Sequence, residues 1–143
     1  MAIKQLTVFI QNKKGTVVSV TDILSKNNIN IRALSIAETQ DFGILRLIVN
    51  DEACAEKVLL ENGYLIKVID VIGVKIGDAP GKLTEALSVL NAANINVEYL
   101  YAFMARPEKH AYVVLRVEDN DIAENILTKA GFKMISEQDI KKL

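Results

Sequence analysis

Residues 15–34 read GTVVSVTDILSKNNINIRAL, and residues 81–100 repeat the pattern as GKLTEALSVLNAANINVEYL. At a constant offset of 66 residues the second stretch repeats the residues Gly15, Leu24, Asn28, Ile29, Asn30 and Leu34 of the first. Six identities at one offset would rarely arise by chance, so we interpret the chain as an internal duplication. The repeated core is a glycine, an amphipathic helix, Asn-Ile-Asn and a strand.

The duplication extends beyond this core and divides the chain. Alternating apolar residues at 6–10 match those at 72–76 at the same offset. Beyond a loop at residues 106–108 the offset becomes 68, which places a two-residue insertion in a hairpin, where insertions are tolerated. The sequence therefore predicts two domains, residues 1–70 and 71–143, with no linker between them. Units this small are marginal alone, so we expect them to pack together.

Each half contains the same order of predicted elements. The strand patterns after the first one cover residues 29–37, 44–49, 64–69, 71–76 and 97–104. This β-α-β-β-α-β order predicts an α+β fold of two ferredoxin-like domains, each an antiparallel sheet with both helices on one side. We expect the domains to pack side by side through their first helices or edge strands, which would allow one eight-stranded sheet.

Composition excludes several classes of function. Half of the residues are hydrophobic, 24% are charged and the net charge is −1. Without a basic patch or a basic amphipathic run, we expect neither a nucleic-acid nor a membrane partner. No apolar run approaches the ~20 residues of a membrane span. Residues 1–4 begin a strand pattern rather than a signal peptide, and a single cysteine favours a cytoplasmic location.

Residues suited to catalysis are scarce. Cys54 aligns with Ile122 on the apolar stripe of a predicted helix, which indicates a small buried hydrophobe. His110 is the only histidine and falls at the end of a hairpin, where a surface position is the simpler interpretation. One Cys and one His cannot supply a metal cluster, and no phosphate-binding loop or dinucleotide motif is present. We therefore expect no cofactor and no enzymatic activity.

The repeated motif resembles the signature of the ACT domain. The resemblance lies in the turn Asp78-Ala79-Pro80-Gly81, the helix after it and Asn94-Ile95-Asn96-Val97; the first copy is similar but lacks the proline. The resemblance implies a βαββαβ fold and a regulatory, allosteric module that binds an amino acid at a domain–domain interface. The whole chain is similar to the paired ACT modules of aspartate kinases, without a catalytic domain. A free amino acid and a regulated enzyme or regulator are the partners it implies.

The turn before each first helix suits an amino acid chemically as well. Glycine lets the backbone approach a ligand, and a helix start attracts a carboxylate. We predict a ligand held between one domain's turn and the other domain's Asn-Ile-Asn segment. The second copy's turn is the better candidate, because Asp78 can accept hydrogen bonds from an ammonium group. The alternative is purely structural, with turn formers and helix caps. The candidate residues are Asn12, Gly15, Thr16, Val17, Asn28, Asn30, Asp78, Ala79, Gly81, Lys82, Leu83, Asn94 and Asn96.

Aromatic residues gather in the second copy. Tyr99, Tyr101 and Phe103 alternate and therefore share one sheet face. They could form core under the helices, or an exposed face that packs on another subunit. We favour a subunit contact for part of this stripe, because the aligned residues of the first copy, such as Ala33, are small. This favours a homodimer.

Two other classes of function remain open on this scaffold. A ferredoxin-like domain can also serve as a small enzyme or an RNA-binding module, because fold does not determine function. RNA binding would use a basic, aromatic sheet face, and the tyrosines supply half of that requirement. Saturable binding of one amino acid without turnover would favour the regulatory interpretation.

Overall fold

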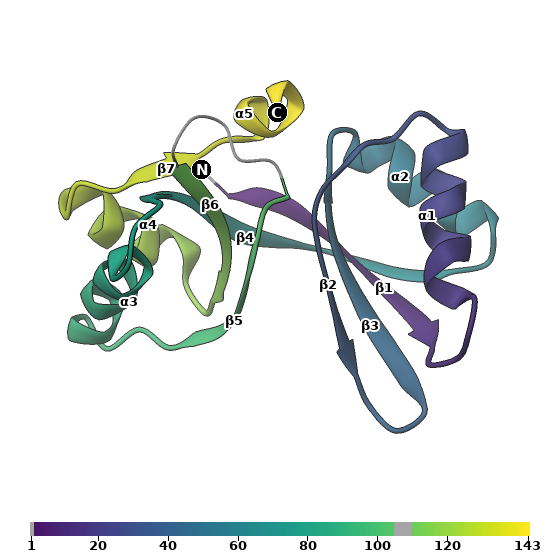
Figure 1. Ribbon diagram of the computed structural model, residues 1–143, viewed down its shortest axis with the longest axis horizontal. Coiled ribbons are helices and arrows are strands. Elements are labelled where there is room, and N and C mark those ends of the chain that lie inside the picture. The colour runs from purple at the N-terminus through teal and green to yellow at the C-terminus, as the bar shows by residue number, and fades with distance from the viewer. Residues whose placement is uncertain (1, 105–109) are drawn as a thin grey trace.

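The computed structural model describes residues 2–104 and 110–143 (Figure 1). The first half comprises β1 (Ile3–Gln11), α1 (Thr16–Lys26), β2 (Ile31–Glu38), β3 (Phe42–Val49) and α2 (Glu52–Glu61). The strand β4 (Leu65–Gly77) follows and belongs to both halves. The second half continues with α3 (Lys82–Ala92), β5 (Val97–Ala102), β6 (His110–Val117), α4 (Asn120–Lys129), β7 (Lys133–Ile135) and α5 (Glu137–Lys142).

Both halves form the predicted ferredoxin-like unit, and every strand pairing is antiparallel. In the first unit the strands lie in the order β2-β3-β1-β4, and in the second in the order β7-β4-β6-β5. Helices α1 and α2 cover one side of the first sheet, while α3 and α4 cover the second sheet on the opposite side of the molecule (Figure 1). Each helix pair buries an apolar core against its own sheet, with Leu6 and Leu24 in one and Ile72 and Leu90 in the other.

Strand β4 replaces two separate strands that the sequence predicted. Residues 64–69 and 71–76 were expected to be separate strands, but the chain stays extended through Asp70. Residues 65–71 of β4 pair with β1, and residues 72–77 pair with β6. The described residues therefore form seven strands instead of eight. The domain boundary proposed at residues 70 and 71 lies inside this shared strand, where the pairing changes from β1 to β6 without a break in the extended chain.

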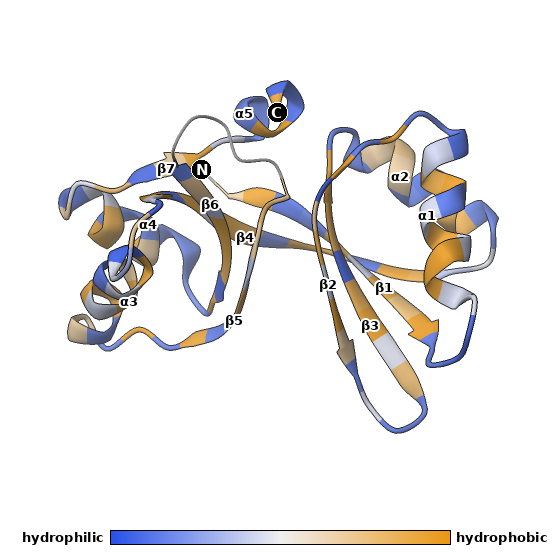
Figure 2. Cartoon of the chain, viewed as in Figure 1, coloured by the Kyte–Doolittle hydropathy of each residue, from blue (hydrophilic) through white to orange (hydrophobic). Residues whose placement is uncertain are grey.

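The open faces of the two sheets pack against each other. A third apolar cluster joins Ile3 and Ile48 of the first unit to Val114 and Phe103 of the second. The units lie side by side, but the predicted contact through the first helices is wrong, since the helices face outward (Figures 1 and 2). The edge strands meet at one bridge, Ala33 to Phe103, and at a hydrogen bond from Met104 N to Arg32 O of 2.8 Å.

The aromatic stripe lies inside this interface. Tyr101 and Phe103 are 7% and 6% exposed, and the Phe103 ring packs edge-on against Tyr112 at 6.0 Å between centroids. A subunit contact through these two residues is therefore wrong, and so is a core under the helices. The small residue Ala33 of the first copy leaves room for the Phe103 ring of the second. The small residues of the first copy and the aromatic residues of the second therefore fit together within one chain.

A polar network crosses the same interface. Gln5 is fully buried on β1. Its Nε2 donates to Thr7 Oγ1 at 3.0 Å and to the Tyr99 hydroxyl at 2.9 Å, and the Tyr101 hydroxyl donates to Gln5 Oε1 at 2.7 Å. The Arg46 guanidinium lies 3.8 Å from the centroid of the Tyr99 ring. Burial raises the pKa of Tyr101, so its hydroxyl remains protonated and able to donate.

The hairpin loop at residues 106–108 lies outside the described residues, and His110 is the half-buried first residue of β6 instead of a loop residue. Cys54 is partly buried and packs against the first core, close to the expectation. In the part of the chain that the structure describes, no helix is both long and apolar enough to cross a bilayer.

The C-terminal helix α5 is held by a capping box, and this yields a stability prediction. The Ser136 hydroxyl oxygen accepts a hydrogen bond from Asp139 N at 3.2 Å, and the Asp139 carboxylate accepts one from Ser136 N at 2.9 Å. Ser136→Ala should lower the free energy of unfolding by about 1 kcal/mol in urea titrations, the usual loss for an N-cap. Gln138→Ala, at an exposed position of the same helix, is the matched control and should have little effect.

This effect should depend on pH. The backbone N–H of Ser136, and to a smaller extent its hydroxyl, donate to the Asp139 carboxylate and lower the pKa of Asp139 below its usual range. A carboxyl with a lowered folded-state pKa stabilises the fold above its unfolded-state pKa, and the stabilisation disappears as pH falls through the folded-state pKa. Ser136→Ala keeps the backbone N–H and removes only the hydroxyl bond to Asp139, so the difference between wild type and Ser136→Ala should shrink in acid by the part that this hydroxyl bond contributes. An equal difference at neutral and acidic pH would contradict a stabilising hydrogen bond from the Ser136 hydroxyl to Asp139.

Candidate functional site

Helices α1 and α3 begin differently from the other three. Gly15 and Gly81 stand at their N-caps with φ of 89° and 88°, a left-handed conformation that favours glycine, and neither helix has a side-chain cap. Helices α2, α4 and α5 are instead capped by the side chains of Asp51, Asp119 and Ser136. The first N–H groups of a helix need partners. Thr16 N and Lys82 N donate within the turns, to Lys13 O at 3.4 Å and to Ala79 O at 3.2 Å. The repeated glycine turns therefore leave each helix start without a capping side chain to offset its partial positive charge.

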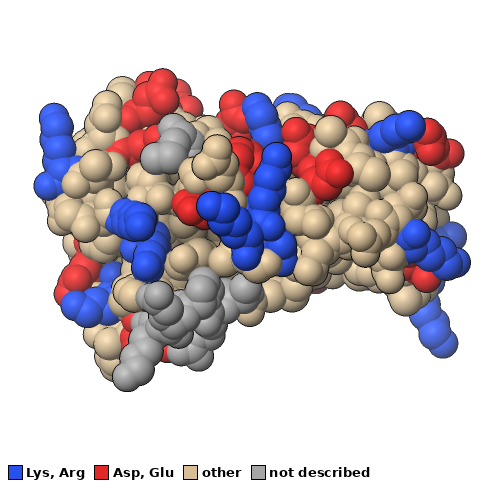
Figure 3. Space-filling view, turned by 90° about the horizontal axis from the view of Figure 1, so that it is seen from above, with Lys and Arg blue, Asp and Glu red and all other residues tan. Residues whose placement is uncertain are grey.

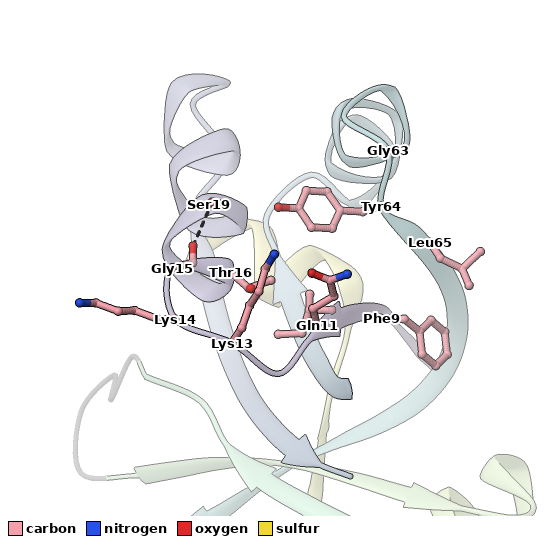
Figure 4. Close-up of a pocket in the computed structure, with 11 residues that line it drawn as sticks. Phe9, Gln11, Lys13, Lys14, Gly15, Thr16, Ser19, Gly63, Tyr64 and Leu65 are labelled. Carbon is pink, nitrogen blue, oxygen red and sulfur yellow. Dashed lines mark hydrogen bonds between the residues drawn. The ribbon is translucent and has the colours of Figure 1, made fainter. Parts of the chain in front are cut away.

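The start of α1 borders a cavity of about 740 Å³. Its lining comes from the end of β1, the turn into α1, and the segment joining α2 to β4 (Figure 4). The lining residues are Phe9, Ile10, Gln11, Lys13, Lys14, Gly15, Thr16, Ser19, Gly63, Tyr64 and Leu65. Gly15 and Thr16 were predicted to contact a ligand, and here they lie in one wall of a cavity.

Polar groups converge on the inside of this cavity. Figure 4 shows Gln11, Lys13 and the Tyr64 hydroxyl directed into the space between α1 and the start of β4, while Lys14 points away. Thr16 Oγ1 is enclosed and has no hydrogen-bond partner among the described residues. The arrangement offers donors, acceptors and one ammonium group to a small polar molecule.

The start of α3 borders the equivalent but smaller cavity, of about 410 Å³. Lys75, Lys82, Glu85 and Phe132 contribute to it, and Lys82 Nζ lies 3.5 Å from Glu85 Oε1. Its lining includes Lys82 from the predicted set. Asp78, Ala79, Gly81 and Leu83 are exposed and do not line it.

The Asn-Ile-Asn segments have a clear structural role. Asn28 and Asn94 adopt positive φ, 57° and 61°, one residue after the C-caps of α1 and α3. The next residue in each copy donates its N–H back into the helix, from Ile29 to Leu24 O and from Ile95 to Leu90 O, both at 2.9 Å. This pattern ends a helix, and asparagine is the side chain that best tolerates it after glycine. The structural alternative therefore accounts for these two residues.

The turns and the Asn-Ile-Asn segments do not meet within one chain. Asn28 and Asn30 line a cavity of about 390 Å³ beside Met104 of the second unit. Asn94 and Asn96 line another of about 820 Å³ beside Arg116. Neither cavity contains a residue of the turns before α1 or α3. A ligand site that combines a turn with such a segment stays a prediction and would require a second chain.

Several residues of the α1 cavity were absent from the sequence-based set. Gln11, Lys13, Ser19 and Tyr64 line it, whereas Asn12 and Val17 do not. The available signal was the repeat itself, since Tyr64 aligns with Phe132 and thus adds a hydroxyl to the first copy. Among residues 2–104 and 110–143, no group of three or more His, Cys, Asp or Glu could hold a metal ion.

The sequence profile of the family described as "ACT domain pair" matches residues 1–143. The chain belongs to this family. The observed pair of ferredoxin-like units, with an uncapped glycine turn before the first helix of each, fits an ACT domain pair along its whole length.

Solved structures agree with this assignment of fold. Protein BT0572 from Bacteroides thetaiotaomicron is 38% identical, with a TM-score of 0.92 over 100% of this chain and 98% of that one. The ligand-free regulatory subunit of aspartate kinase from Thermus thermophilus is 15% identical, with a TM-score of 0.66 over 90% and 91% of the two chains. E. coli aspartokinase III in complex with lysine and aspartate is 18% identical, with a TM-score of 0.51 over 90% of this chain and 31% of that one. None of the curated proteins matches this chain.

Proposed function

We propose that this ACT domain pair is a non-enzymatic regulatory protein that senses a free amino acid and signals to a separate partner. The observation that carries the proposal is the uncapped start of α1, which opens into a polar cavity. Family membership supports it, because ACT domains are regulatory modules. The partner would be an enzyme or a regulator in the cytoplasm.

The α1 cavity can satisfy both charges of an amino acid. The carboxylate would lie beside Gly15 and Thr16 at the start of α1, where the helix supplies partial positive charge. Gln11 Oε1 and the Tyr64 hydroxyl oxygen offer acceptors to the ammonium group. The sequence alone favoured the second copy's turn as the ligand site. The geometry supports the first copy's turn better, because the α3 cavity is smaller and holds the ion pair of Lys82 and Glu85.

Binding at α1 would be communicated along β1. Strand β1 contributes Phe9, Ile10 and Gln11 to the cavity, and further along it Gln5 and Thr7 take part in the network between the units. A ligand that shifts the end of β1 would thus act on the contact between the two sheets. A homodimer would present this change to a partner from two symmetric copies. Sedimentation at tens of micromolar protein would test whether the chain is a dimer.

The RNA-binding alternative loses its main support. The sheet face that would stack bases is covered, since Tyr101 and Phe103 are buried between the units. On the face shown in Figure 3, Lys and Arg side chains are interspersed with Asp and Glu and do not form one basic area.

Tyr64→Phe tests the site without threatening the fold. Phenylalanine occupies the equivalent position 132 in the second copy, so the ring should be tolerated. A thermal-shift screen of the twenty amino acids should find one that raises the melting temperature with concentration, because it binds only the folded state. Tyr64→Phe should then weaken that ligand roughly five- to ten-fold in calorimetry, the usual effect of losing one hydrogen bond.

Phe132→Tyr is the matched control, because it places the same hydroxyl in the second copy. It should leave the affinity unchanged if the ligand occupies the α1 cavity. Equal affinity in Tyr64→Phe and wild type would place the ligand elsewhere, and a screen without any binder would refute the proposed function itself.

A further inference from the structure

The α1 cavity is one-sided in charge. Of its eleven lining residues, Lys13 and Lys14 are charged and none is Asp or Glu. The Lys13 ammonium points into the cavity toward Tyr64, as Figure 4 shows. The start of α1, in the same wall, adds partial positive charge. A small molecule in this cavity therefore meets positive charge from two sources, in a chain whose net charge is −1.

The positive charge of Lys13 is not neutralised within the described part of the chain. The ion pairs found there involve Lys4, Lys26, Lys82 and Arg116, and none involves Lys13. The equivalent α3 cavity differs in this respect, because Lys82 is paired with Glu85. The first cavity thus presents an ammonium group that a bound ligand could pair with.

Resting on the proposed function, we infer that the ligand of the α1 cavity is an acidic amino acid, with a second carboxylate on its side chain. Its main-chain carboxylate lies at the start of α1, in the partial positive charge of the helix, and its side-chain carboxylate meets Lys13. The Tyr64 hydroxyl can donate to either carboxylate, while Gln11 Oε1 accepts from the ammonium. A ligand with a net charge of −1 complements this cavity, whereas a basic amino acid would bring a second cation into it.

The shape of the cavity allows this arrangement. Lys13 and the start of α1 belong to the same turn, with Gln11 beside Lys13 and Tyr64 across the space from them (Figure 4). The volume of about 740 Å³ accommodates an amino acid together with water. Because Lys13 is exposed, its interaction with a ligand is partly screened, and a moderate, salt-dependent effect is expected.

Amide isosteres provide the test. Calorimetry on the full chain at low salt would compare aspartate with asparagine and glutamate with glutamine, pairs that match in shape and differ in charge. We expect one of the acids to bind at least about five-fold tighter than its amide. Added salt should reduce the difference.

Lys13→Met keeps most of the aliphatic stem and should abolish the preference for the acid over its amide. Lys82→Met in the second copy should preserve that preference.

The outcomes separate this inference from the proposed function. Tighter binding of a neutral or basic amino acid, weakened by Tyr64→Phe, would overturn the acidic preference and leave the sensor function intact. An acidic preference that persists unchanged in Lys13→Met would overturn the assignment to this cavity. Absence of binding by any amino acid would overturn both.

Discussion

Phe103→Ala should lower the free energy of unfolding by roughly 3–5 kcal/mol, the usual range for truncating a buried phenylalanine. Phe103 is 6% exposed and lies between the two sheets, against Ala33 of one and Tyr112 of the other. Urea unfolding would measure the loss. Phe42→Ala removes the same ring from a position that is 43% exposed and should cost far less.

A compensating change makes this prediction sharper. Ala33 pairs with Phe103 at the bridge between the two edge strands, and both lie in the same apolar cluster, so Ala33→Leu should refill part of the cavity that Phe103→Ala leaves. Alone, Ala33→Leu should overpack the interface and cost about 1–3 kcal/mol. The double variant should therefore be more stable than the sum of the two losses predicts. Strict additivity would show that the two residues do not share one packed interface.

Gln5→Val should cost roughly 2–4 kcal/mol, although valine occupies the equivalent position 71 of the second copy. The reason is the network at the interface. Without Gln5, the buried Tyr101 hydroxyl loses its acceptor, and Tyr99 loses a donor. A buried hydroxyl without a partner is costly, whereas removing both partners can be nearly neutral.

A double-mutant cycle would isolate this network. In the Gln5→Val background, Tyr101→Phe removes the stranded hydroxyl and should recover about 1 kcal/mol or more, although it should destabilise the wild-type chain. A coupling energy near zero would contradict the network. Thr21→Val, which changes a hydroxyl on α1 that donates to Val18 O and takes no part in the Gln5 network, serves as a control that should show no coupling to Gln5.

Much of the fold was readable from local pattern. Alternation in residues 6–10, the helical stripe after Gly15 and the repeat at a constant offset are local properties of the chain, and they predicted two βαββαβ units. Gly15 and Gly81 were predicted as turn residues before the helices, and the structure adds that both adopt a positive φ that favours glycine. The repeated asparagines were recognised, and their main role proved to be ending a helix.

Contacts between distant residues required the tertiary structure. The facing of the two sheets, which buries Tyr101 against Gln5 and Phe103 against Ala33, depends on pairs separated by about 70 to 96 residues. No periodicity in either strand specifies its partner, because alternation shows that a face is buried but not what covers it. The α1 cavity has the same origin. Gln11 ends β1, Lys13 lies in the turn that follows it, and Tyr64 directly precedes β4. Only the antiparallel pairing of β1 with β4 brings the three side chains around one space.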